Sequence, residues 1–143
     1  MIDPLAAVIA LVKADVGLQA LVEDRIAERH KFGLTTARAW PTPAPALQLL
    51  PVPGTQPDRE VGFQRLRLEA RCYGDRPATA GEVYAALVAL TRRTNRAVVP
   101  TANGAALIYF LLLDGTPESG FDDDIKIDVQ RVYLVAEVAE DPV

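Results

Sequence analysis

The sequence has very few of the side chains that usually carry chemistry. It holds one cysteine, Cys72, so neither an internal disulfide nor a cysteine-based zinc site can form. It holds one histidine, His30, which excludes a site built from several histidines. Cys72 falls in the apolar register of a predicted strand and His30 lies in a charged connector. We interpret neither as catalytic, and the residues predict no enzyme and no cofactor.

Long hydrophobic runs are also missing. The longest uninterrupted apolar stretch is 105–113, whereas a helix needs about 20 residues to cross a bilayer. The first four residues lack the basic segment that opens a signal peptide. With 143 residues, of which 50% are hydrophobic and 24% charged, the composition predicts one soluble globular domain over residues 1–143 and no membrane association.

Charge is distributed unevenly along the chain. Residues 1–100 carry 13 basic and 10 acidic side chains, and residues 101–143 carry 2 and 9. Such an acidic last third does not favour binding to nucleic acid through its phosphates. It is typical of a solvated acidic surface, or of a surface that nucleic acid passes without binding. The triplet Asp122, Asp123, Asp124 lacks the ligand spacing of an EF-hand loop, so we interpret it as a solvated turn, with a cation site as the alternative.

Apolar periodicity predicts two helices and four strands. The first helical segment covers residues 4–23, where Asp3 precedes Pro4 as an N-cap; it is one long helix or, because Asp15 can restart a helix, two shorter ones. The second helix begins near Pro77. The strands cover 46–50, 63–73, 104–113 and 125–138, with 46–50 at an edge and a β-bulge at Gln130-Arg131. This order, α-β-β-α-β-β, predicts an α+β fold: a four-stranded, mainly antiparallel sheet with both helices packed on one face.

The predicted strand 104–113 has more apolar residues than one buried face requires. Two helices can cover only one side of the sheet, yet this strand is apolar on both sides. Either the proline-rich loop 41–62 covers the second side, or another subunit does. The candidate subunit interface combines the odd-numbered positions of this strand with a stripe of arginines on strand 63–73: Leu107, Tyr109, Leu111, Leu113, Arg65, Arg67 and Arg71.

Five segments, taken in order, resemble the tail terminator (tail completion) family of long-tailed bacteriophages and related phage-like particles. They are Asp3-Pro4-Leu5, Leu21-Val22-Glu23-Asp24-Arg25-Ile26, Pro45-Ala46-Leu47-Gln48-Leu49, Leu66-Arg67-Leu68-Glu69-Ala70-Arg71-Cys72-Tyr73-Gly74 and Gln130-Arg131-Val132-Tyr133-Leu134-Val135-Ala136-Glu137-Val138. The resemblance covers nearly the whole chain. It departs from the family between residues 27 and 45, where the linker is long and rich in proline.

This resemblance implies a structural virion protein without enzymatic activity. It implies a homohexameric ring at the head-proximal end of the tail tube, which ends tube polymerisation. The implied partners are further copies of the chain, the major tail tube protein and the head-tail connector or stopper protein, while genome DNA passes the bore without sequence-specific binding. The implied location is the tail or neck of the virion, assembled in the host cytoplasm. Two loops, 52–62 and 114–124, are the candidate contacts to tube or connector, through Pro53, Gln56, Asp58, Glu118, Phe121 and Asp122.

Two other readings stay open at the level of the sequence. A head-side head-tail joining protein belongs to the same structural class. A small α+β binding module without a virion role would need neither the ring nor the acidic last third.

Overall fold

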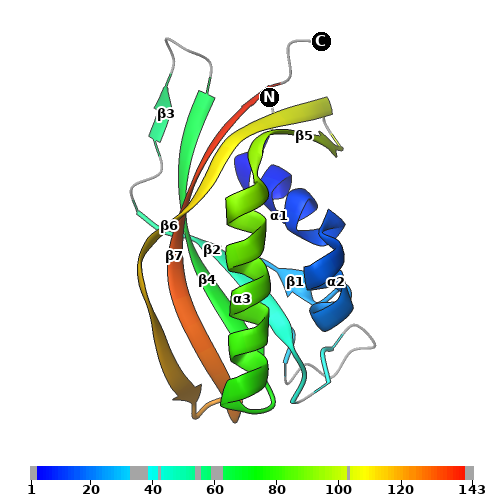
Figure 1. The fold of residues 1–143 in the computed structure, drawn as a ribbon, viewed down its shortest axis with the longest axis vertical. Helices are drawn as coiled ribbons and strands as arrows, with labels where there is room; N and C mark the ends of the chain where they lie inside the picture. Colours follow the sequence, from blue (N-terminus) through cyan, green and yellow to red (C-terminus); the bar gives the residue numbers. More distant parts are fainter. Residues whose placement is uncertain are drawn as a thin grey trace.

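The computed structural model describes residues 3–32, 39–41, 43–53, 56–58, 63–102 and 104–140. Within them lie three helices and seven strands (Figure 1). The elements are α1 (Pro4–Ala14), α2 (Val16–Val22), β1 (Ile26–Ala27), β2 (Ala46–Pro51), β3 (Gln56–Asp58), β4 (Phe63–Gly74), α3 (Pro77–Arg93), β5 (Asn95–Thr101), β6 (Gly104–Asp122) and β7 (Ile127–Glu140).

All the strands join one curled, mixed sheet in the order β1-β2-β4-β7-β6-β5, and β3 pairs with β4 beside this path. Only β1 and β2 are parallel among the strand pairs. The three helices cover one face, which we call the inner face. The predicted four-stranded sheet with two helices is therefore wrong. It missed β1, β3 and β5, because strands this short or this polar leave little alternation to detect.

The predicted helix 4–23 divides at Asp15. Asp3 caps α1, as expected, since its Oδ1 accepts the backbone N–H of Leu5 (3.0 Å). Asp15 then ends α1 and caps α2, its Oδ2 accepting the backbone N–H of Leu18 (2.9 Å). No single helix in the described residues is long and apolar enough to span a membrane; α1 and α2 pass that test only as a pair, bent by 84°.

All four predicted strands are present, but their ends differ from the prediction, and one of them has a different position in the sheet. The prediction 46–50 corresponds to β2, but β1 pairs outside it, so β2 is not an edge strand. Residues 114–122, predicted as a loop, continue β6 as far as Asp122. From Leu111 onward β6 pairs with β7 alone in the described part of the chain.

The main core lies between the inner face of the sheet and the helices. Alternate residues of β4 and β7 point into it, as the period of two requires, and meet apolar residues from α1, α2 and α3. Its largest fully buried side chains include Leu18, Leu47, Leu49, Leu68, Leu87, Ile108, Leu111 and Leu134.

A second, smaller core lies on the other face and accounts for the expected bulge. The pairing of β4 with β7 runs without a shift from Phe63/Ala139 to Gly74/Asp128, so the bulge predicted at Gln130-Arg131 is wrong. The buried positions of β7 change parity because its first residues pack on the opposite face from its later ones. This small core contains Phe32, Trp40, Ala44, Ala46, Tyr73, Ile127 and Val129.

Polar bonds hold the small core to the sheet. The Tyr73 hydroxyl donates to Oε1 of the buried Gln48 (2.7 Å), whose Nε2 donates to the backbone carbonyl of Glu28 (3.1 Å). Burial raises the pKa of Tyr73, so this phenol keeps its proton as a donor. Part of the proline-rich linker thus covers the second face at one end of the sheet.

Gly74, the last residue of β4, lies directly against the first turn of α3. A Cβ at this position would stand 2.3 Å from the backbone nitrogen of Ala80, in the first turn of α3. We expect Gly74→Ala to lower the free energy of unfolding by about 2–3 kcal/mol, because backbone has to move. Gly120→Ala is the matched control, since nothing lies within 4 Å of its new Cβ. Urea unfolding of both variants tests this, and equal midpoints would contradict it.

Candidate interaction surface

The face of the sheet turned away from the three helices, which we call the outer face, is the candidate site. The β4–β7 and β6–β7 registers decide which residues point to it. Its positions beyond the small core are Arg65, Arg67, Glu69 and Arg71 on β4, Arg131, Tyr133, Val135 and Glu137 on β7, and Leu107, Phe110, Leu112, Asp114 and Glu118 on β6.

A bulge in β6 divides the apolar face expected there. The register with β7 shifts between Ile108 and Phe110, so Ile108 and Leu111 both point into the main core and are fully buried. Leu113 also packs against that core, whereas Leu107 stays on the outer face. Leu107, Tyr109, Leu111 and Leu113 therefore do not share one face, and Leu111 and Leu113 are core residues.

Large apolar side chains are nevertheless exposed on the outer face. Val98 of β5, opposite Leu107, is 58% exposed, Leu112 is 53% exposed and Tyr133 is 41% exposed. Exposed apolar residues that gather on one face are typical of an interaction surface. The alternation of side chains along β7 could have identified Tyr133. Tyr133 lies at alternate positions, and therefore on one face, with Arg131, Val135 and Glu137.

The arginine stripe lies on the same face and is held by acidic neighbours. Arg65 Nη2 lies 2.9 Å from Glu137 Oε1, and Arg71 Nε lies 2.9 Å from Glu69 Oε1. Burial lowers the pKa of Arg71, but the opposing effects, led by the hydrogen bond and charge of Glu69, outweigh it, so the net shift is upward.

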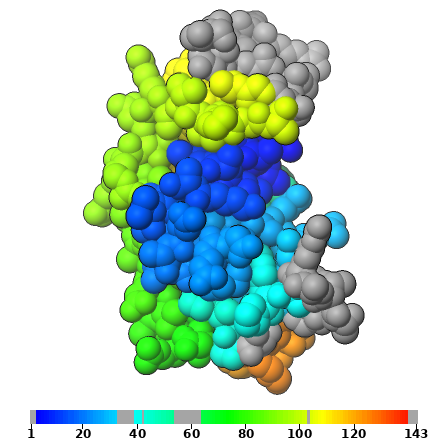
Figure 2. All heavy atoms as spheres, turned by 90° about the vertical axis from the view of Figure 1, so that its right-hand side faces the viewer, coloured from blue at the N-terminus to red at the C-terminus, as the bar shows by residue number. Residues whose placement is uncertain are grey.

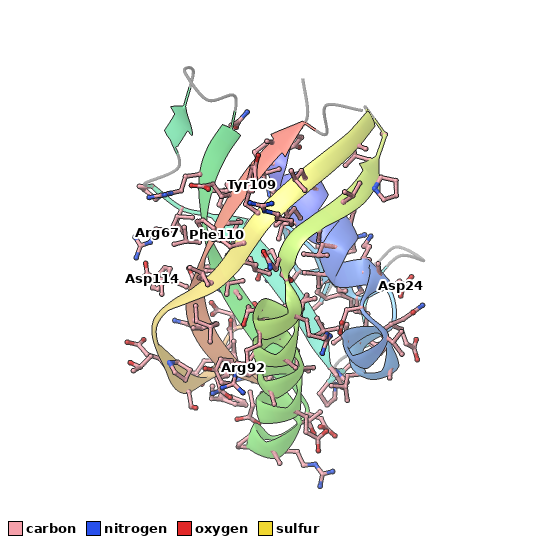
Figure 3. The ribbon with its side chains drawn as sticks, turned by 45° about the horizontal axis from the view of Figure 1, so that its top comes forward. Asp24, Arg67, Arg92, Tyr109, Phe110 and Asp114 are labelled. Atoms are coloured by element: carbon pink, nitrogen blue, oxygen red, sulfur yellow. The ribbon has the colours of Figure 1, made fainter. Side chains whose placement is uncertain are left out.

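Arg67 joins the charged and apolar parts of this face. Its Nε lies 3.4 Å from Asp114 Oδ2, and its guanidinium carbon lies 4.6 Å from the centre of the Tyr133 ring. Figure 3 shows Arg67 and Asp114 side by side on the side of the sheet away from the helices. Exposed ion pairs contribute about 0–1 kcal/mol each, so their main effect is to fix side-chain positions.

The six residues expected to contact tube or connector lie in two regions, one beside the first half of β4 and one beside its second half. Pro53 follows β2, and Gln56 and Asp58 lie in β3, beside Arg65 and Phe63 of β4. Glu118, Phe121 and Asp122 lie in the distal part of β6. Along β4 the two regions are separated by about 20 Å between Gln56 and Glu118 and by about 35 Å between Asp58 and Phe121, at about 3.3 Å per residue.

The distal end presents one large apolar side chain and a capped turn. Phe121 is 51% exposed. The Asp122 Oδ1 accepts the backbone N–H groups of Asp124 (3.0 Å) and Ile125 (3.3 Å), which gives this carboxylate a structural use. No group of three or more potential metal ligands occurs in the described residues.

Cys72 and His30 are placed among packed side chains. The His30 ring centroid lies 5.9 Å from that of Phe32 and 6.2 Å from that of Tyr73. Cys72 is fully buried, and this burial raises its pKa to about 12. A thiol reagent therefore meets neither an accessible sulfur nor a thiolate in the folded chain.

We expect Cys72 to react with a disulfide reagent at pH 8 only after global unfolding. Labelling should proceed at least 100-fold more slowly in buffer than in denaturing urea. A released-chromophore assay measures both rates. Comparable rates in the two conditions would show that the thiol is exposed by a local opening.

No protein-family model matches the chain, and no curated protein matches it in sequence. A search of solved structures found a similar chain in the virion of a native gene transfer agent (GTA) particle. The two chains are 17% identical, the TM-score is 0.62, and the match covers 95% of this chain and 94% of the other. The likeness shows a shared fold over almost the full length of both chains.

Proposed function

We propose that the chain is a structural component of a phage-like virion. The observation that carries this proposal is the shared fold with a chain of the GTA virion, over 95% of the present chain. The sequence resemblance to tail terminator proteins supports the same class independently of that match.

Within this class, we propose a homohexameric ring at the head-proximal end of the tail tube. Such a ring has to contact the tube on one side and the head-tail connector or stopper on the other. The two candidate contact regions lie about 20–35 Å apart along β4. One chain therefore can present separate surfaces to two partners stacked along the tail axis.

The negative charge of the β6–β7 hairpin supports the passage of genome DNA through such a ring. The distal half of the β6–β7 hairpin is acidic and exposed, with only Lys126 and Arg131 as basic residues. Its acidic residues are Asp114, Glu118, Asp122, Asp123, Asp124 and Asp128. If this part lines the bore, it repels phosphates and lets DNA pass without binding. In this proposal the chain is located in the tail or neck of the virion.

Electron microscopy of negatively stained protein tests the ring, alone and with tail tubes of the same particle. We expect rings of uniform diameter, or caps at one end of the tubes. Caps bound to connectors but never to tubes would instead support a head-side joining protein. Monomers that bind neither partner would contradict the proposal.

We expect Leu112→Asp to abolish ring formation, because it places a charge among the exposed apolar residues of the outer face. Ala78→Asp is the matched control, since Ala78 is exposed in the first turn of α3. Light scattering should show a lower mass for the first variant only, with unchanged circular dichroism for both. An unchanged mass for Leu112→Asp would remove the outer face from the subunit contact.

A further inference from the structure

The layer of helices contains an apolar groove. It lies between the α1–α2 junction and α3 and has a volume of about 410 Å³. Figure 2 views this side of the molecule, with α1 and α2 in blue beside α3 in green. The lining residues are Ala14, Asp15, Val16, Gly17, Ala86, Ala89 and Arg93.

Val16 and Arg93 give the groove its chemical character. Val16 is 79% exposed, more than any other large hydrophobic residue in the described chain. Arg93 supplies a guanidinium that is 58% exposed and pairs with the Asp15 carboxylate, itself only 7% exposed. The groove is thus an apolar depression with one fixed, accessible cation at its wall.

A ridge on the outer face has the complementary character. Leu112 and Tyr133 are its apolar members, and Asp114 lies opposite Tyr133 in the β6–β7 register. The Asp114 side chain is 51% exposed. The ridge thus combines two large apolar side chains with an accessible carboxylate that also pairs with Arg67, and the groove combines apolar walls with an accessible guanidinium that also pairs with Asp15.

Groove and ridge lie on opposite layers of the molecule, so one chain cannot bring its own two surfaces together. We propose that the Leu112/Tyr133/Asp114 ridge of one copy binds in the Val16/Arg93 groove of the next. The contact joins two different surfaces, and repetition of such a contact closes into a ring when the rotation between copies permits. This inference rests on the ring described under "Proposed function". It names the groove in the helix layer as the surface that the outer face of the neighbouring copy contacts.

Disulfide trapping tests this pairing directly. Leu112→Cys in one batch and Val16→Cys in another put one accessible thiol on each surface, while the native Cys72 is buried and inert. We expect the mixed batches to form a heterodimer at least five times more readily than either batch forms a homodimer. Val98→Cys, 58% exposed on the outer face but outside the ridge, replaces Leu112→Cys as the control.

Charge reversal within the cysteine variants then tests the Asp114–Arg93 contact. We expect Asp114→Arg or Arg93→Asp alone to lower the trapping yield about tenfold. Combining the two, one on each partner, should restore it. Arg92→Asp is the matched control, because Arg92 is exposed on the same turn of α3 but does not line the groove.

The outcomes separate this inference from the ring itself. Equal trapping with Leu112→Cys and Val98→Cys, or no restoration by the double reversal, would overturn the ridge-in-groove contact even if microscopy shows rings. Selective trapping and restoration would support the contact. If no ring then appears in any preparation, the contact stands as a head-to-tail association and the ring fails.

Discussion

The unbroken pairing of β4 with β7 is the constraint on which the rest of the structure depends. Twelve consecutive residue pairs, from Phe63/Ala139 to Gly74/Asp128, fix which side chains of the sheet centre meet the helices. A slip by one residue would move the whole set to the other face. The main core, the arginine stripe and the small core around Tyr73 all follow from that one register.

Both faces of the central strands are therefore used, but for different purposes along their length. The inner face is apolar from Leu66 to Cys72 of β4 and from Val132 to Val138 of β7, and the helices bury this part. The outer face is covered near Tyr73 by Phe32 and Trp40, and farther along it presents ion pairs and exposed apolar residues. This division gives one small domain a sealed core and still leaves a broad surface for a partner.

The sequence predicted the structure correctly where apolar and charged residues alternate regularly along a strand. Residues 63–73 alternate between apolar and charged, so the strand, its faces and the arginine stripe could be read directly. The prediction failed at residues 104–113, because an apolar run carries no sign of the bulge that sends Leu111 inward and Leu112 outward. It also failed at Ile127 and Val129, where a second core on the opposite face imitates a bulge.

Only part of the candidate surface could be predicted from the sequence. Arg67 was placed on the outer face because its neighbours alternate between charged and apolar residues, and Leu107 shares that face. The exposure of Val16 depends on the 84° bend at Asp15, which brings a short helix beside α3. Asp15 indicated a possible break in the helix, but no local pattern predicts its angle, since Val16 continues the same apolar stripe as α1.

In the described residues, β6 beyond Leu111 has a strand on one edge only, and this affects how copies can associate. An unpaired strand edge is a template for adding strands without limit, as in amyloid. Here the register breaks between Asp114 and Glu118, where Gly115 has a φ of 96° and Pro117 lacks an N–H group. The interrupted edge resists such fibrous growth, so association through the faces of the sheet and helices can stop at a closed, finite assembly.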